Sequence, residues 1–169
     1  MRAVLTNSGC ANAVTGEAGL DDTRALVEQV RASLAPSSEC TPTDVLMMST
    51  GVIGVRLPVL PMQRAIEDLV SGRLLQNHPE AWLDVARAFM TTDTFPKLRT
   101  RSFSLGGRQC RIAGIDKGAG MIHPRMASAS SALHATMLGL FATDAPIATP
   151  DLQRCLNEAC LLYTSDAAD

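Results

Sequence analysis

Residues 3–13, AVLTNSGCANA, run from a short apolar stretch into a series of small and polar residues. Ala3–Leu5 has the composition of a strand, and Asn7–Ala13 is rich in residues that favour tight loops. A second apolar run, Asp44–Met48, breaks in the same way at Ser49–Gly54, STGVIG. These two strand-to-loop junctions, with a helical pattern between them, are the starting point for the fold class.

Apolar residues at helical spacing follow both junctions. Asp21-Asp22-Thr23 is typical of a helix N-terminus, and Leu26 and Val30 lie on the apolar face that follows it. Proline suits the first turn of a helix, which places later helix starts at prolines. Helices are predicted from Asp21 to Leu34, from Pro58 or Pro61 to Val70, from Pro79 to Met90, and from Thr149 onward.

A hairpin is predicted in the second half of the chain. Residues 102–105 and 108–115 have strand composition, and Gly106-Gly107 between them is a common two-residue turn. Met137–Phe141 is an apolar run that periodicity assigns to neither strand nor helix. Strands and helices mix without a regular βαβ alternation, so the expected fold class is layered α/β (α+β).

Composition excludes several classes of protein. The chain has 169 residues, of which 46% are hydrophobic and 4% aromatic, enough for an aliphatic core of one domain or part of a larger one. A net charge of -2 gives no basic patch for nucleic acid and none for a membrane surface. No apolar run reaches the roughly 18 residues of a membrane span. Five cysteines without CxxC spacing, and no signal peptide, predict reduced thiols and a cytoplasmic location.

Four polar loops follow elements of regular structure, and each has an ordinary interpretation when taken alone. Thr50-Gly51 is compatible with a simple turn, and residues 91–94, TTDT, with helix caps and local backbone hydrogen bonds. Lys117 beside glycines is compatible with a solvated loop, and Thr136 with a core position. His123 has no second histidine or carboxylate near it in sequence, so neither a metal site nor a Ser-His-Asp arrangement is predicted.

Together the loops closely resemble the ornithine acetyltransferase family, the bifunctional glutamate N-acetyltransferases of arginine biosynthesis. The resemblance rests on five motifs in family order: NSGCANA (7–13), STGVIG (49–54), TTDTFPK (91–97), KGAGMIHP (117–124) and ATML (135–138). It implies a layered sandwich of mixed sheets and helices with an N-terminal-nucleophile-like, self-processing active site. Cys10 stands where the family often has asparagine.

The resemblance implies a threonine nucleophile. The precursor is cleaved between Ala135 and Thr136, and Thr136 becomes the first residue of a β chain. A freed α-amine beside a threonine hydroxyl can act as its base. Thr50 and Gly51 match the oxyanion-stabilising positions, and Thr91 and Lys117 match substrate-binding positions together with Thr136.

The implied reaction moves acetyl from N2-acetyl-L-ornithine to L-glutamate through an acetyl-threonine intermediate, without a cofactor or metal. Acetyl-CoA stays open as a second donor, because no residue pattern distinguishes the two cases. The implied partners are these small molecules and an α2β2 assembly, with no nucleic acid and no membrane. A related aminopeptidase is the alternative enzyme, although TTDT and KGAG favour the transferase.

The chain departs from the family at the cleavage junction. Residues 128–135 behave as an eight-residue insertion before Thr136. Uninterrupted spacing would place the nucleophile at Ser128, whereas the motif that continues through Met137-Leu138-Gly139 places it at Thr136. Because self-cleavage needs a strained and preorganised peptide bond, we expect a flexible insertion to impair it.

The expected domain organisation is a fragment of a single acetyltransferase domain, residues 1–159, with α-chain sequence to residue 135 and β-chain sequence from residue 136. Residues 160–169, CLLYTSDAAD, resemble a translated sequencing adapter and are excluded from the predicted fold. Because most of the family's β chain is missing, a catalytically inactive fragment is the alternative to an active enzyme.

Overall fold

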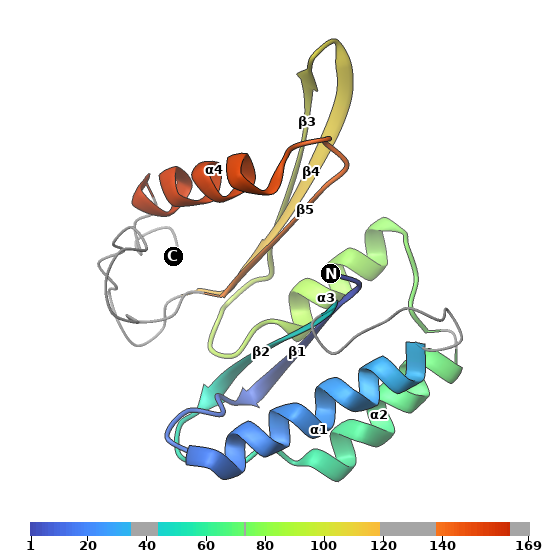
Figure 1. Cartoon of the computed structure of the whole chain (residues 1–169), viewed down its shortest axis with the longest axis vertical. Helices are drawn as coiled ribbons and strands as arrows, with labels where there is room; N and C mark the ends of the chain where they lie inside the picture. The colour runs from blue at the N-terminus through green and yellow to red at the C-terminus, as the bar shows by residue number, and fades with distance from the viewer. Residues whose placement is uncertain (35–43, 73, 119–137, 163–169) are drawn as a thin grey trace. The chain divides into compact units, whose positions relative to one another are not determined.

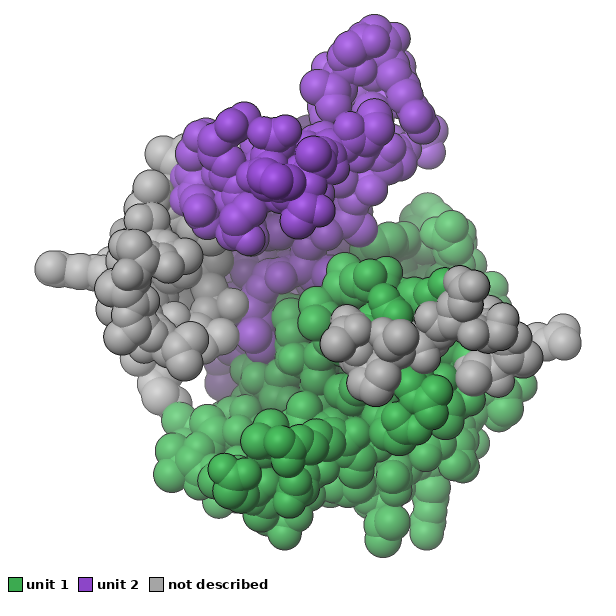
Figure 2. Space-filling model, in the orientation of Figure 1, with its two compact units in different colours: residues 1–91 green, residues 92–169 purple. Residues whose placement is uncertain are grey.

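The computed structural model describes residues 1–34, 44–72, 74–118 and 138–162 of the chain. The chain divides into two compact units, an N-terminal unit of residues 1–91 and a C-terminal unit of residues 92–169 (Figures 1 and 2). Each unit carries its own sheet and at least one helix, and the two are described in turn.

The N-terminal unit contains a two-stranded parallel sheet. Strands β1 (Ala3–Cys10) and β2 (Val45–Val52) pair in register along their whole length. Parallel strands need a crossover connection, and helix α1 (Gly16–Leu34) lies between them in sequence. Helix α2 (Val59–Ser71) packs against α1, and α3 (Pro79–Ala88) follows.

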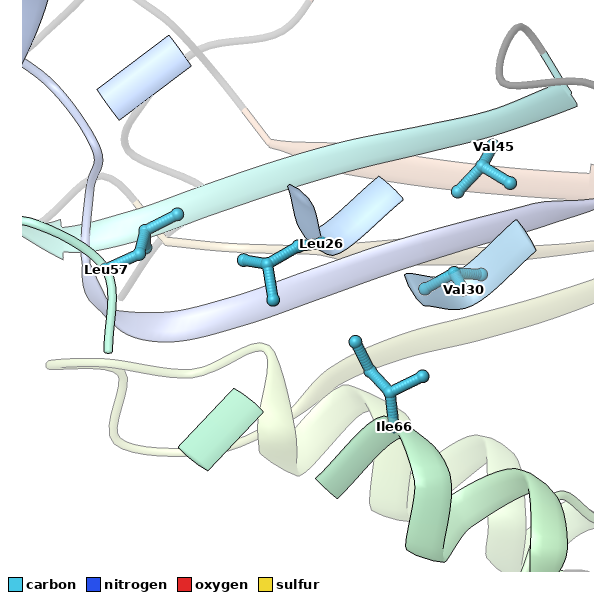
Figure 3. Packing of buried hydrophobic residues seen from close by; sticks show 5 residues of the cluster. All are labelled: Leu26, Val30, Val45, Leu57 and Ile66. Carbon is cyan, nitrogen blue, oxygen red and sulfur yellow. The ribbon is translucent and has the colours of Figure 1, made fainter. Parts of the chain in front are cut away.

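The core of this unit is aliphatic. Leu26 and Val30 of α1 are one helical turn apart, so they point to the same side and meet Val45 of β2. Leu57 and Ile66 close the cluster (Figure 3). Leu26 is fully buried, and the other four members are at most 7% exposed. The predicted inward face of the first helix is therefore confirmed.

An ion pair with a buried carboxylate and an exposed guanidinium joins α1 to the segment after β2. Asp22 is 5% exposed, and its carboxylate accepts hydrogen bonds from Nε and Nη2 of Arg56, the first at 2.9 Å. The hydrogen bonds and the negative charge of Asp22 raise the pKa of the Arg56 guanidinium. The pair fixes the chain that leaves the strand end at Thr50-Gly51.

Substituting Asp22→Asn is expected to lower the free energy of unfolding by about 1–2 kcal/mol. The cost stays below that of a fully buried pair because the Arg56 side chain is 60% exposed and regains water. Asp21→Asn is the matched control. Asp21 is 68% exposed and pairs with Arg24 on the helix surface, so its loss should cost less than about 0.5 kcal/mol. Urea unfolding followed by circular dichroism measures both, and equal costs would contradict a special role for Asp22.

The C-terminal unit contains an antiparallel sheet in the order β3-β4-β5. Strands β3 (Lys97–Leu105) and β4 (Arg108–Asp116) form the predicted hairpin, and β5 (Gly139–Thr143) pairs with β4. Gly106 and Gly107 have φ of +57° and +79°, as a two-residue type I′ turn requires. Helix α4 (Thr149–Leu162) follows the sheet.

The mixed α/β class is confirmed, and the differences lie in element ends. Both parallel strands extend further than predicted, to Cys10 and Val52, because each strand's backbone continues to pair with the other. Helix α1 begins at Gly16 instead of Asp21. Residues 139–141 of the ambiguous run belong to strand β5. Residues 135, 136 and 163–169 lie outside the described ranges, and residues 160–162 of the proposed adapter form the end of α4. The chain boundary and the adapter remain predictions.

None of the helices within the described ranges is both long enough and apolar enough to cross a bilayer. Three cysteines in those ranges, Cys10, Cys110 and Cys155, carry free thiols.

Candidate functional site

The carboxyl ends of the parallel strands bring two predicted motifs together. Ser8 pairs with Thr50, and Gly9 pairs with Gly51. The loops beyond the strands are also joined, because Ala11 N–H donates to the Val52 carbonyl at 2.9 Å and Gly54 N–H donates to the Ala13 carbonyl at 2.8 Å. The carboxyl ends of parallel strands are a common place for ligands in α/β proteins. Residues 7–13 and 49–54 therefore form one surface.

The backbones of Gly9 and Gly51 lie in close contact within this surface. Their φ angles are +136° and +129°, a region that side chains rarely adopt. A Cβ atom at Gly51 would overlap the carbonyl group of Gly9 and lie 2.8 Å from the Cys10 nitrogen. The two backbones approach so closely that only glycine fits at position 51. Thr50, a partly buried residue, is thereby held beside a backbone with a fixed conformation.

Asn12 anchors the first loop to helix α1. It has a φ of +50°, and its side-chain amide donates to the Gly19 carbonyl and to Thr23 Oγ1, both at 2.9 Å. Its side-chain oxygen accepts a hydrogen bond from Thr15 Oγ1 at 2.9 Å. Asparagine tolerates this backbone conformation better than most residues. Asn12 therefore serves as a turn residue and also connects the loop to α1 through its side-chain hydrogen bonds.

Ser8 was not predicted, yet it links the strand ends to the segment that carries Thr91. Its hydroxyl donates to the Ala88 carbonyl at the end of α3. Thr91 follows three residues later and is exposed. Beside it, Asn7 donates to the Cys10 carbonyl at 2.9 Å, and its buried Oδ1 accepts no hydrogen bond from the described residues. Three predicted residues, Thr50, Gly51 and Thr91, therefore belong to one unit.

Lys117 belongs to the C-terminal unit. It follows strand β4 directly, and its backbone N–H donates to the Leu138 carbonyl at 3.1 Å. Its ammonium donates to the Gly118 carbonyl at 3.0 Å. Leu138 comes two residues after Thr136 in sequence. The pairing of β4 with β5 thus holds the two ends of the segment that carries the predicted nucleophile.

Asp93 is the residue whose role the sequence interpretation missed. We expected the loop TTDT to make local backbone hydrogen bonds, but Asp93 accepts the N–H of Gly118, 25 residues away, at 2.6 Å. It also pairs with Lys97 at 2.9 Å. The only available signal was the i, i+4 spacing of opposite charges, which is common on protein surfaces and does not reveal a buried pair.

Two predicted site residues, Ala135 and Thr136, lie outside the described residues, as do His123, Ser128 and the rest of the insertion. The remaining four fall into two groups: Thr50, Gly51 and Thr91 in the N-terminal unit, and Lys117 in the C-terminal unit. Among the described residues, no group of three or more His, Cys, Asp or Glu side chains could hold a metal ion.

Comparison with known proteins gives consistent matches. The model of the ArgJ family matches residues 1–162. The arginine biosynthesis bifunctional protein ArgJ of Malassezia globosa is 62% identical over 170 residues, which cover 94% of this chain and 33% of that protein. The chain thus spans about a third of the length of the curated relatives it matches.

Two crystal structures share the fold. The ArgJ protein of Bacillus halodurans is 32% identical with a TM-score of 0.64, over 73% of this chain and 61% of that one. An ornithine acetyltransferase of Mycobacterium tuberculosis, solved in complex with ornithine, is 31% identical with a TM-score of 0.57, over 70% and 60%.

The predicted cytoplasmic location is wrong. The curated fungal relatives are named as mitochondrial proteins, which points to the mitochondrion. The prediction failed because the charge and cysteine content of a folded segment do not determine the compartment of a protein. Targeting segments that receptors recognise determine it.

Proposed function

The chain belongs to the ArgJ family, and from this premise we propose that it carries part of a site that transfers an acetyl group from N2-acetyl-L-ornithine to L-glutamate in arginine biosynthesis. The observation that carries the proposal is the joined surface at the ends of β1 and β2. There Thr50 pairs with Ser8, and Gly51 lies against Gly9 in a conformation that only glycine permits.

The proposed nucleophile is Thr136, released as an N-terminal residue by cleavage after Ala135. Its hydroxyl oxygen attacks the acetyl carbonyl of N-acetylornithine, and its own α-amine takes the hydroxyl proton. The amide C–N bond then breaks, ornithine leaves with that proton, and an acetyl-threonine ester remains. The amine of glutamate attacks this ester, which releases N-acetylglutamate and restores the threonine.

Thr50 and Gly51 are the proposed oxyanion donors, through a hydroxyl group and a backbone N–H. Each such donor is typically worth about 3 kcal/mol of transition-state stabilisation. A rigid backbone supports this role, because preorganised donors need no rearrangement when charge develops on the oxygen. The close approach of Gly9 to Gly51 supplies that rigidity.

Thr91 and Lys117 are the proposed substrate-binding residues together with Thr136. The Lys117 ammonium would attract the substrate carboxylate as a point charge. Acetyl-CoA is a second donor compatible with the same acyl-enzyme. We further propose that α chains ending at residue 135 and β chains starting at residue 136 assemble as α2β2, and that residues 160–169 lie outside the acetyltransferase domain.

A completed chimera tests this function. In it, residues 1–159 of this chain replace the matching segment of the Malassezia globosa relative. In the form of the chimera that also lacks residues 128–135, which is expected to cleave, Thr50→Ala should lower kcat for acetyl transfer to glutamate by about 100-fold, with a small change in KM, because the hydroxyl acts on the developing oxyanion. The release of ornithine and the formation of N-acetylglutamate are measured together by chromatography.

Ser49→Ala is the matched control, since neighbouring residues on a strand point to opposite faces. It should keep kcat within about threefold of the parent. Thr50→Ser retains a hydroxyl and should recover most of the activity. A chimera that cleaves correctly but transfers no acetyl group, or a Thr50→Ala variant with unchanged kcat, would contradict the proposed role.

A further inference from the structure

The chain has two lysines, Lys97 and Lys117, and the buried carboxylate of Asp93 binds the first through its ammonium and the second through the backbone N–H of the next residue, Gly118. The side chain of Asp93 is 2% exposed, and that of Lys97 is 11% exposed. Their charged atoms are 2.9 Å apart, and the Lys97 ammonium also lies 4.5 Å from the ring centre of Phe95. A charge this deeply buried needs a partner in place, so Lys97 serves as the counter-ion of Asp93.

Asp93 also holds the backbone next to Lys117. Its Oδ1 accepts the Gly118 N–H at 2.6 Å, a length typical of strong bonds to an ionised acceptor. Gly118 is buried, and a Cβ atom there would lie 2.5 Å from this same oxygen. The absence of a side chain at position 118 is therefore what allows the carboxylate to reach the amide.

The Lys117–Gly118 segment is held from both directions. Gly118 N–H is bound by Asp93, and Lys117 N–H is bound by the Leu138 carbonyl at 3.1 Å. The Lys117 ammonium itself contacts the Gly118 carbonyl, and none of the carboxylates in the described ranges forms an ion pair with it. Of the two lysines, Lys117 is the one whose charge can meet an incoming anion.

We propose that Asp93 is a positioning residue of the substrate site: with Lys97 as its fixed counter-ion, it holds the Lys117–Gly118 backbone so that the Lys117 ammonium binds the α-carboxylate of an N-acyl amino acid. The inference rests on the proposed function, which supplies the ligand of Lys117. It adds a residue that does not touch the substrate and acts only through the backbone of Gly118.

The presence of only two lysines makes the test direct. The chain is labelled with ¹³Cε-lysine, and the two side-chain signals are assigned with Lys117→Met, which leaves the Asp93–Lys97 pair intact. N-acetylornithine should shift the Lys117 signal and leave the Lys97 signal in place. Asp93→Ala should weaken the affinity read at Lys117 about tenfold. Asp93→Asn keeps an oxygen acceptor for Gly118 N–H and should lose less than about threefold.

Hydrogen exchange of the Gly118 amide separates positioning from general stability. Asp93→Ala should speed this exchange, and Asp93→Asn should largely preserve its protection. Asp144→Ala is the matched control, because Asp144 accepts the Arg111 N–H at the same 2.6 Å elsewhere in the unit. It should leave both Gly118 exchange and the affinity at Lys117 unchanged. If Asp93→Ala fails to fold, Asp93→Ala with Lys97→Met removes both buried charges and should show the same tenfold loss.

Three results would overturn the inference. Unchanged Gly118 exchange in Asp93→Ala would show that the carboxylate does not hold this backbone. Faster exchange with unaltered affinity at Lys117 would make Asp93 structural only. In the third result, N-acetylornithine does not shift the Lys117 signal of the parent chain, although Gly118 exchange depends on Asp93. This would refute the substrate role of Lys117 and show that the proposed function, and not the Asp93–Gly118 contact, is wrong.

Discussion

Substituting Gly51→Ala is expected to destabilise the N-terminal unit by about 4 kcal/mol and to abolish acetyl transfer in the completed chimera that lacks residues 128–135. Two costs combine. A side chain at φ of +129° is strained, which costs about 1–3 kcal/mol. Its Cβ would also overlap the Gly9 carbonyl, so the strands must separate. Urea unfolding of the chain measures the loss of stability, and N-acetylglutamate formation by the chimera measures the loss of acetyl transfer.

Gly9→Ala is the control that separates strain from overlap. Gly9 has nearly the same φ, +136°, but a Cβ there meets nothing within 4 Å. It should cost only the strain, about 1–3 kcal/mol. Similar losses of stability for both substitutions would show that the close approach of the strands contributes nothing. In that case the rigid backbone offered for the oxyanion donors would lose its support.

Deleting residues 128–135 from the chimera should change self-cleavage from absent or slow to complete. The deletion places Thr136 directly after Ala127. A shorter connection between the anchored Lys117 and Leu138 leaves the Ala–Thr bond fewer conformations, and effective preorganisation can change a rate by several orders of magnitude. Mass spectrometry of the purified chimera reports the cleavage directly, through a new fragment that begins at Thr136.

The control for this deletion carries Thr136→Ala as well and should remain a single polypeptide, because the attacking hydroxyl group is gone. Efficient cleavage of the undeleted chimera before Thr136 would show that the insertion does not impair the reaction. A fragment that starts at Ser128 in the undeleted chimera would show that spacing, and not the surrounding motif, selects the nucleophile.

Local sequence patterns predict most of the secondary structure. The glycine pair at 106–107 predicts the hairpin, and the prolines predict the starts of α2 and α3 to within a residue or two. Residues 7–10 have the composition of a loop, because small and polar residues are poor strand formers. They are strand because the backbone of β2 pairs with them through to Cys10↔Val52, and that partner lies far away in sequence.

The motifs alone are enough to propose Thr50, Gly51, Thr91 and Lys117 as site residues, but they do not predict the contacts that hold these residues in place. They do not identify Ser8, which binds the Ala88 carbonyl, because that bond links residues 80 positions apart. The same holds for Asp22, whose partner Arg56 is 34 residues later, since no local rule distinguishes Asp22 from its exposed neighbour on the same helix.

The sequence by itself determined the family, the mixed α/β class and the identity of the residues proposed for chemistry, since each of these depends on residue types in a fixed order. Only the tertiary structure decided which backbone Asp93 holds and why position 51 must be glycine. Both are consequences of close approach between segments far apart in the chain. The Asp93–Gly118 hydrogen bond is 2.6 Å long, and a Cβ at position 51 would lie 2.3 Å from the Gly9 carbonyl, so the available space decides which side chain is tolerated.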